Sequence, residues 1–261
     1  MDRDLGRFLC SRSNKKIYVN GDTLTKVYDP VLMPKAKVLW EAWMQSVAET
    51  TELDVPKVKR VYPVDDSWAI DLDYIAGESL EQQMQNHPEE VEKSIDSLVD
   101  IQMSVLATTC VGLPDMKDKF NRKISALGRT SDPRKHVEAT IRYELHVALD
   151  RMPAHRKLCH GDLLPDNILF DSRSGRPFIF DWAHASLGDA GADAAHTYLK
   201  MIIEGHRDWA ECYLKSYARK TDTALQYLRS WFPIVSATML DQVDSSADIK
   251  MLQEIIATIE E

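Results

Sequence analysis

Alternating apolar and polar residues fill much of the first 76 positions of the chain. The alternation predicts strands at Phe8–Cys10, Lys16–Val19, Thr23–Tyr28, Lys57–Val64 and Trp68–Ile75. Asn20-Gly21-Asp22 has the composition of a tight turn, so the second and third strands are expected to form a hairpin. In the last strand large apolar residues alternate with smaller or acidic ones, which predicts one face in the core and the other in water. An antiparallel sheet is therefore expected.

One helix is expected within this first part. Pro34 suits the first turn of a segment with helical spacing that runs to about Thr50. Leu39, Trp43 and Val47 fall on one side of it and are expected to be the buried stripe, with Glu41 beside them.

The periodicity changes after Ser79, where the chain becomes helical apart from two strands in its middle. This change predicts a lobe boundary, with residues 1–76 as the smaller lobe and 77–261 as the larger. Helices are predicted near 91–106, 120–127, 137–149, 208–219, 223–241 and 247–259. Another helix is expected to begin near Ala194 with Asp193 as its N-cap. The predicted class is α+β.

Chemistry is concentrated at the ends of the two central strands. Asp162 is followed five positions later by Asn167, and Asp181 ends an apolar run fourteen positions after that. A carboxylate at the end of a buried strand needs a cation or hydrogen bonds to offset its desolvation. Magnesium prefers oxygen ligands and fits Asn167 and Asp181, which leaves Asp162 as a base for a hydroxyl. Phosphoryl transfer needs this division of labour, and two strands with polar loop ends are the less favoured alternative.

The pattern His160-Gly161-Asp162, four residues, Asn167, then an apolar strand ending in Asp181-Trp182 resembles the aminoglycoside phosphotransferase and choline kinase family. The resemblance is nearest to a bacterial branch of these small-molecule kinases and covers most of the chain. It implies a two-lobed protein-kinase-like fold, with a small antiparallel-sheet N-lobe that carries one helix and a larger, mainly helical C-lobe. It also implies Asp162 as catalytic base, Asn167 and Asp181 as magnesium ligands, His160 as a buried scaffold of the loop, and Asp193 as a brace for it.

The same resemblance assigns nucleotide contacts in the first lobe. Lys26 would contact the α- and β-phosphates of ATP, and Glu41 would pair with Lys26. Ser11 and Ser13, in a loop of residues 11–15 that contains no glycine, would offer donors to the phosphates. Solvated positions for Lys26 and Glu41 are the alternatives that the sequence leaves open.

Adenine would meet the backbone of Asp73 and Ile75, since a strand end offers both a donor and an acceptor. The other interpretation of this segment is a plain interdomain turn.

Two departures from protein kinases favour a small acceptor. Gly161 stands where protein kinases usually have Arg, and Leu164 where they have Lys. Without that arginine the usual control by activation-loop phosphorylation is not expected. The short segment from Ala183 to Asp193 leaves little room for a peptide-binding loop.

Charge and composition limit the partners. The net charge of −9 argues against nonspecific nucleic-acid binding, and most of it lies beyond residue 76, which favours a cationic acceptor. Solvated helix faces explain the acids equally well. No stretch has the apolar length to span a bilayer, and Met1–Leu5 lacks the start of a secretory signal. With four dispersed cysteines, a cytoplasmic location is expected.

The predicted function is therefore ATP-dependent transfer of the γ-phosphate to a hydroxyl of an aminoglycoside-, choline- or sugar-like small molecule. A nucleotide-binding regulator without catalytic activity is the alternative from another class, and a protein kinase is a third. The sequence gives no information on the oligomeric state.

Overall fold

The computed structural model describes residues 4–12 and 14–260, and the backbone forms two compact units. The first takes the chain up to Asn86 together with Thr108–Gly112 and Pro165–His184. The second takes His87–Ala107, Leu113–Leu164 and the chain from Ala185 onward. Part of the segment considered for a secretory signal, residues 1–3, lies outside the described residues. The boundary expected after residue 76 stays a prediction.

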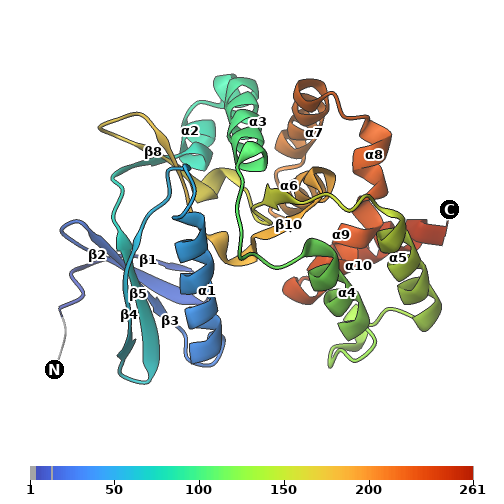
Figure 1. Ribbon diagram of the computed structural model, residues 1–261, viewed down its shortest axis with the longest axis horizontal. Coiled ribbons are helices and arrows are strands. Elements are labelled where there is room, and N and C mark those ends of the chain that lie inside the picture. The colour runs from blue at the N-terminus through green and yellow to red at the C-terminus, as the bar shows by residue number, and fades with distance from the viewer. Residues whose placement is uncertain (1–3, 13, 261) are drawn as a thin grey trace. The chain divides into compact units, whose positions relative to one another are not determined.

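An antiparallel sheet with strand order β1-β2-β3-β5-β4 forms one side of the first unit (Figure 1). Its strands are β1 (Arg7–Arg12), β2 (Lys15–Asn20), β3 (Thr23–Tyr28), β4 (Val58–Val64) and β5 (Ser67–Asp73). The predicted hairpin between β2 and β3 is confirmed. Gly21 adopts a φ of 58°, a left-handed conformation that tight hairpin turns need and that glycine adopts without a steric penalty.

Helix α1 (Lys35–Ala48) packs on this sheet through a stripe that differs from the predicted one. Val38 and Ala42 join Tyr28 and β5 in the core, while Leu39 and Trp43 are 42% and 46% exposed. The prediction of a buried Leu39–Trp43 stripe was therefore wrong. Its physical reason is that Glu41 must face the sheet to reach Lys26, and that requirement sets the rotation of the helix.

The second face of β5 is also not the wet face that the alternation predicted. Asp71 is fully buried and accepts hydrogen bonds from the hydroxyls of Thr25 (2.7 Å) and Tyr62 (2.9 Å). Arg60 adds an ion pair. A buried carboxylate with these partners is compensated, so an acidic residue at this position did not mark solvent.

A smaller antiparallel sheet of order β6-β8-β9 completes the first unit. It consists of β6 (Gly77–Ser79), β8 (Ile168–Asp171) and β9 (Pro177–Ile179), and α2 (Leu80–Asn86) follows β6 directly. Short 3₁₀ turns at Pro165–Asn167 and Trp182–His184 lie just before β8 and shortly after β9.

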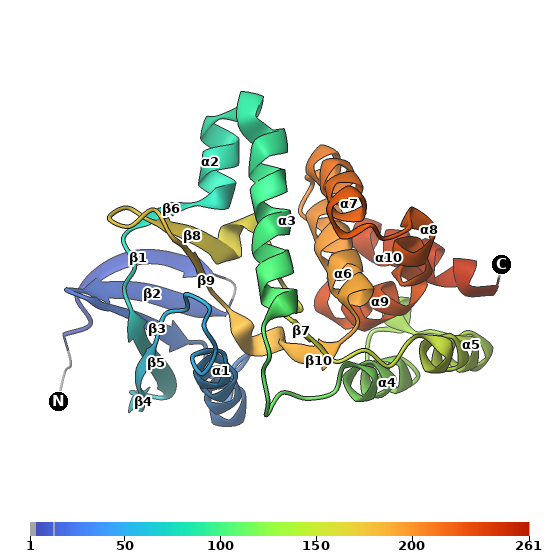
Figure 2. The same ribbon diagram turned by 45° about the horizontal axis from the view of Figure 1, so that its top comes forward.

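Helices dominate the second unit, and α3, α6 and α7 lie side by side (Figure 2). The helices are α3 (Val91–Ala107), α4 (Met116–Ala126), α5 (Ala139–Arg151), α6 (Ala190–Ile203), α7 (Arg207–Thr221), α8 (Leu225–Ser230), α9 (Phe232–Met239) and α10 (Ser246–Ala257). A two-stranded ribbon pairs β7 (Lys157–Cys159) with β10 (Ser186–Gly188).

Two helix predictions in this unit were wrong in detail. The expected helix over 223–241 is two helices, because Pro233 sits in the first turn of α9, where its ring is compatible only with a helix start. Helix α6 begins at Ala190 rather than near Ala194. Its N-cap is Asp189, whose side chain accepts from the NH of Gly191, and Asp193 therefore lies in the first turn.

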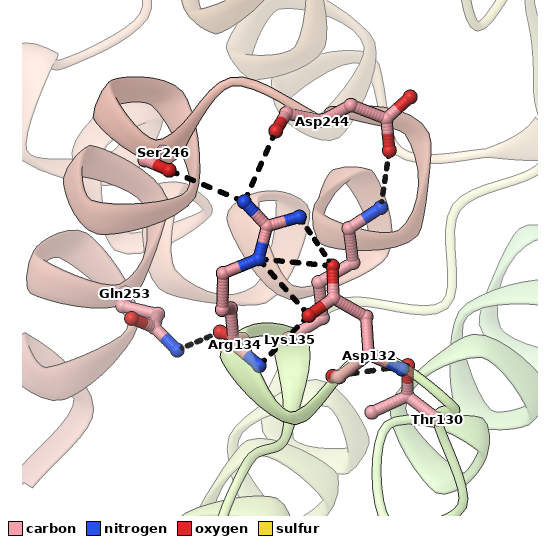
Figure 3. Close-up of polar contacts among 7 residues, drawn as sticks. All are labelled: Thr130, Asp132, Arg134, Lys135, Asp244, Ser246 and Gln253. Atoms are coloured by element: carbon pink, nitrogen blue, oxygen red, sulfur yellow. Dashed lines mark hydrogen bonds and ion pairs between the residues drawn. The ribbon is translucent and has the colours of Figure 1, made fainter.

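The connection between α4 and α5 is tied to the C-terminal helix by polar contacts (Figure 3). Arg134 pairs with Asp132 at 2.7 Å and donates to the hydroxyl of Ser246 at 3.2 Å. Lys135 pairs with Asp244 at 2.9 Å. The contacts fix this loop against the start of α10.

Within the described part of the chain, no helix combines the length and apolarity needed to cross a bilayer. The cysteines Cys10, Cys110, Cys159 and Cys212 are free thiols.

Candidate functional site

The first unit contains an ion pair between the two residues expected to form it. Lys26 projects from β3 and its Nζ lies 3.0 Å from Oε1 of Glu41 on α1. The hydroxyl of Tyr28, two residues along the same face of β3, donates to the same oxygen at 2.6 Å. All three residues are buried, so the pair is a fixed internal structure rather than a surface contact.

Asp181 joins this pair from the segment after β9. Its carboxylate forms an ion pair with Lys26, and its backbone has a φ of 59°, which is uncommon for a residue with a side chain. Strained backbone of this kind persists where surrounding contacts hold it, often at functional sites.

Lys15 is a fourth member of the cluster, and the sequence analysis did not single it out. Its Nζ lies 3.2 Å from Asp181 and 3.8 Å from Glu41, and its side chain is 11% exposed. The hairpin register shows why it belongs there: Lys15 lies opposite Tyr28, which shares a face of β3 with Lys26.

The charges in the cluster compensate one another. Burial opposes ionisation of Lys26, but the carboxylates of Asp181 and Glu41 outweigh it and raise the pKa of the ammonium well above its usual value. Burial likewise opposes ionisation of both carboxylates, and the neighbouring Lys26 and Lys15 reverse that effect, so the pKa values of Glu41 and Asp181 are lowered. Lys26, Glu41 and Asp181 are therefore all ionised at neutral pH.

Asn167 is brought close to Asp181 by the pairing of β8 with β9. The carbonyl oxygen of Asn167 accepts from the NH of Phe180 at 2.9 Å, so the two candidate metal ligands flank one end of the ribbon. One amide oxygen and one ionised carboxylate are hard donors that fit Mg²⁺ when phosphate oxygens complete its shell. Among the described residues no group of three or more His, Cys, Asp or Glu side chains forms a metal site by itself. The residues present thus fit a metal shared with phosphate.

The loop between β1 and β2 borders a hollow of about 270 Å³, whose lining includes Ser11, Asn14 and Lys15. Ser11 is exposed on β1. Ser13, the other residue expected to contact phosphate, lies outside the described residues.

The end of β5 and the residues after it have fewer free backbone groups for adenine than expected. The NH of Asp73 donates to the carbonyl oxygen of Lys57 at 3.0 Å, and the NH of Tyr74 donates to that of Asp22 at 2.9 Å. Of the two residues expected to meet adenine, Asp73 can therefore offer only its carbonyl oxygen, and Ile75 would have to provide the donor.

Asp162 belongs to the second unit, where neighbouring helices hold its loop. Gly161 has a φ of 75°, which glycine adopts without strain, and its NH donates to Oδ1 of Asp193 at 2.7 Å. The other carboxylate oxygen of Asp193 accepts from the side chain of Gln102 on α3 at 3.0 Å. His160 is fully buried, as expected. The expected brace by Asp193 is thus present, and Gln102 is a supporting residue that the sequence did not single out.

Together these features define the class of protein. An antiparallel sheet with a strand lysine paired to a helix glutamate, followed by a mainly helical portion, is a protein-kinase-like α+β fold. The chain belongs to the phosphotransferase enzyme family, whose family model matches residues 11–229.

Solved structures support the fold. An aminoglycoside-3'-phosphotransferase of type VIII is 18% identical, with a TM-score of 0.63 over 89% of this chain and 93% of that one. Aminoglycoside phosphotransferase APH(3'')-Id from Streptomyces rimosus, in complex with ADP and streptomycin, is 16% identical, with a TM-score of 0.62 over 91% and 94%. A choline/ethanolamine kinase family protein from Mesorhizobium loti is 16% identical, with a TM-score of 0.57 over 98% and 88%. No curated protein matches the chain in sequence.

Proposed function

We propose that this protein is an ATP-dependent kinase that transfers the terminal phosphoryl group to a hydroxyl of a small molecule. The observation that carries the proposal is the Lys26–Glu41–Asp181 cluster, in which a buried, ionised lysine is held by a buried glutamate and a partly exposed aspartate, ready for phosphate oxygens. Structural relatives were solved with ADP or GDP, and one with ADP and streptomycin, which supports a nucleotide donor and a small acceptor.

In this mechanism each residue has one task. Lys26, held by Glu41, binds the α- and β-phosphates, and Ser11, exposed near the end of β1, offers them a hydrogen-bond donor. Asp73 and Ile75 meet adenine through their backbone. Asn167 and Asp181 would hold Mg²⁺, which when bound neutralises charge on the phosphates.

Asp162 acts on the acceptor. It orients the hydroxyl and accepts its proton while the hydroxyl oxygen bonds to the γ-phosphorus and the bond to the β–γ bridging oxygen breaks, which releases ADP. The brace from Asp193 to Gly161 holds the backbone beside this carboxylate.

Asp162→Asn tests the proposal. The change keeps the size and shape of the side chain but replaces one acceptor oxygen with an NH₂ donor and removes the base, so turnover should fall by about 100- to 10,000-fold. Binding of ATP with Mg²⁺, measured as thermal stabilisation, should stay nearly unchanged. Equal loss of binding and turnover would contradict the role of Asp162.

The alternative, a nucleotide-binding regulator, draws on the loop without glycine. It predicts Mg²⁺-dependent stabilisation by ATP with no turnover by the unmodified chain. Release of ADP in the presence of a panel of amines, sugars and antibiotics separates the two functions and also identifies the acceptor. A cytoplasmic location accords with such substrates and stays a prediction.

A further inference from the structure

The hairpin of β1 and β2 carries two cations side by side at its closed end. Arg12, the last residue of β1, pairs with Lys15, the first residue of β2, in the hairpin register. Side chains of directly paired residues lie on the same face of a sheet, so the guanidinium and the ammonium project together. Both residues also line the hollow of about 270 Å³ beside this hairpin.

The two cations reach carboxylates on the ribbon that carries the candidate metal ligands. Nη1 of Arg12 lies 3.7 Å from Asp166, and Nζ of Lys15 lies 3.2 Å from Asp181. Asp166 directly precedes Asn167, and the pairing of β8 with β9 holds Asn167 close to Asp181. Phosphates that share a metal ion with Asn167 and Asp181 would therefore lie within reach of both cations.

The surroundings of Arg12 allow its guanidinium to exchange its partner for another anion. Its separation from Asp166 is longer than a hydrogen bond, and its side chain is 56% exposed. Exposed ion pairs of this kind add little to stability, because water screens them. Among the described residues that line the hollow, Asp29 is the one carboxylate, and it accepts from the NH groups of Val31 and Leu32.

A side chain of this loop has a physical reason to bind phosphate. Residues 11–15 contain no glycine, and a residue with a Cβ keeps its main chain farther from a bound phosphate than glycine does. A guanidinium spans that distance and binds phosphate oxygens through two parallel hydrogen bonds. Asp166, the present partner of Arg12, lies four residues after Asp162 in the chain, so Arg12 is bound at the end of the ribbon that leads to the proposed base. The terminal phosphate is the one expected at that end.

We infer that Arg12 binds the terminal phosphate of the nucleotide in exchange for Asp166, and so makes the site prefer a nucleoside triphosphate to a diphosphate. The inference rests on the proposed function and adds a residue to it. The side chain of Arg12 takes the place of the backbone NH groups that a glycine-containing loop would offer. Because Asp166 competes for the guanidinium, it lowers the affinity for the triphosphate.

Isothermal titration calorimetry with β,γ-imido-ATP and with ADP, each with Mg²⁺, tests the inference. The unmodified protein should bind imido-ATP more tightly than ADP. In Arg12→Met the affinity for imido-ATP should fall by about 10-fold, while that for ADP, which lacks the terminal phosphate, should change by less than about twofold. Arg7→Met changes an exposed arginine at the other end of β1 and is the matched control, in which both affinities should be retained.

Asp166→Asn distinguishes phosphate binding from a merely structural ion pair. Loss of the competing carboxylate should raise the affinity for imido-ATP by about threefold and leave that for ADP unchanged, and the gain should vanish when Arg12→Met is added. A structural pair predicts instead that both single variants weaken the binding of the two nucleotides alike. That result, or an unchanged ratio of the two affinities in Arg12→Met, overturns the inference.

Failure of the proposed function gives a different result in the same titrations. If the unmodified protein binds neither nucleotide, the proposed function fails and the inference fails with it. If the protein binds both and Arg12→Met leaves their ratio unchanged, only the assignment of Arg12 is wrong.

Discussion

The two units stabilise their candidate functional groups in opposite ways. In the first, Lys26, Glu41, Asp181 and Lys15 form a cluster of alternating charges with ion-pair distances of 3.0 to 3.8 Å for three of its contacts. In the second, the loop of Asp162 is held by neutral donors, the NH of Gly161 and the amide of Gln102, on the buried carboxylate of Asp193.

Lys26 shows what the first arrangement achieves. Burial opposes ionisation of its ammonium, yet the carboxylates of Asp181 and Glu41 outweigh it and raise the pKa of Lys26. A charge compensated in this way is stable without ligand and can exchange one partner for another.

Lys26→Met, in the first unit, is expected to have the largest effect, a loss of affinity for ATP. The phosphates lose a charged donor, and affinity for ATP with Mg²⁺ should fall by about 100-fold, which corresponds to about 2.7 kcal/mol. Isothermal titration calorimetry measures the change. Lys35→Met is the matched control, because Lys35 lies over the ring of Trp68 on the same unit and should leave affinity within twofold.

Asp193→Ala should destabilise the second unit. It leaves the NH of Gly161 and the amide of Gln102 without their acceptor, so the free energy of unfolding should fall by about 2 kcal/mol in urea titrations. Arg134→Ala removes the exposed contacts of Figure 3 and should cost less than about 1 kcal/mol. Equal effects of both variants would show that the brace adds nothing beyond a surface contact.

The parts of the site that the sequence predicted are those with local causes. The family resemblance implied that Lys26 on a strand pairs with Glu41 on the helix that follows it, and the two are only fifteen residues apart in the chain. Asn167 and Asp181 flank two short strands that pair with each other, so their proximity follows from one ribbon.

The parts that were missed depend on packing between distant segments. The predicted buried stripe of α1 was wrong because the burial of Glu41 determines the rotation of the helix more strongly than its apolar residues do. Asp193 was expected to cap a helix, and Asp189 caps it instead. Lys15 was missed because only the register of the hairpin shows which way it points.

Lys15→Met tests whether Lys15, in the first unit, binds phosphate or only compensates the charge of Asp181. Lys15 follows the loop without glycine and pairs with Asp181 at 3.2 Å, so we expect its ammonium to contact phosphate once Asp181 binds metal. Its loss should weaken ATP affinity by about 10-fold, or about 1.4 kcal/mol, without loss of the Lys26–Glu41 pair. Lys16→Met changes the exposed neighbour on β2 and serves as the control. Unchanged affinity in Lys15→Met would assign Lys15 to charge compensation alone.

Acid pH should produce the smallest effect, a loss of the stability that the ionised carboxylate of Glu41 gives the native state. Its pKa is lowered in the fold, despite burial, by Lys26 and Lys15, so its ionised form stabilises the native state. This contribution is complete above the ordinary pKa of a glutamate, about 4.3, and is lost as pH falls through the lowered value. The melting temperature of the unmodified protein should therefore exceed that of Glu41→Gln by a few degrees at pH 6, as about 1 kcal/mol gives in a chain of this size, and the gap should narrow below about pH 4. Glu52→Gln, on the surface of the same unit, should show no such gap. A gap for Glu41→Gln that stays constant down to pH 3 would mean that the charge of Glu41 does not stabilise the cluster.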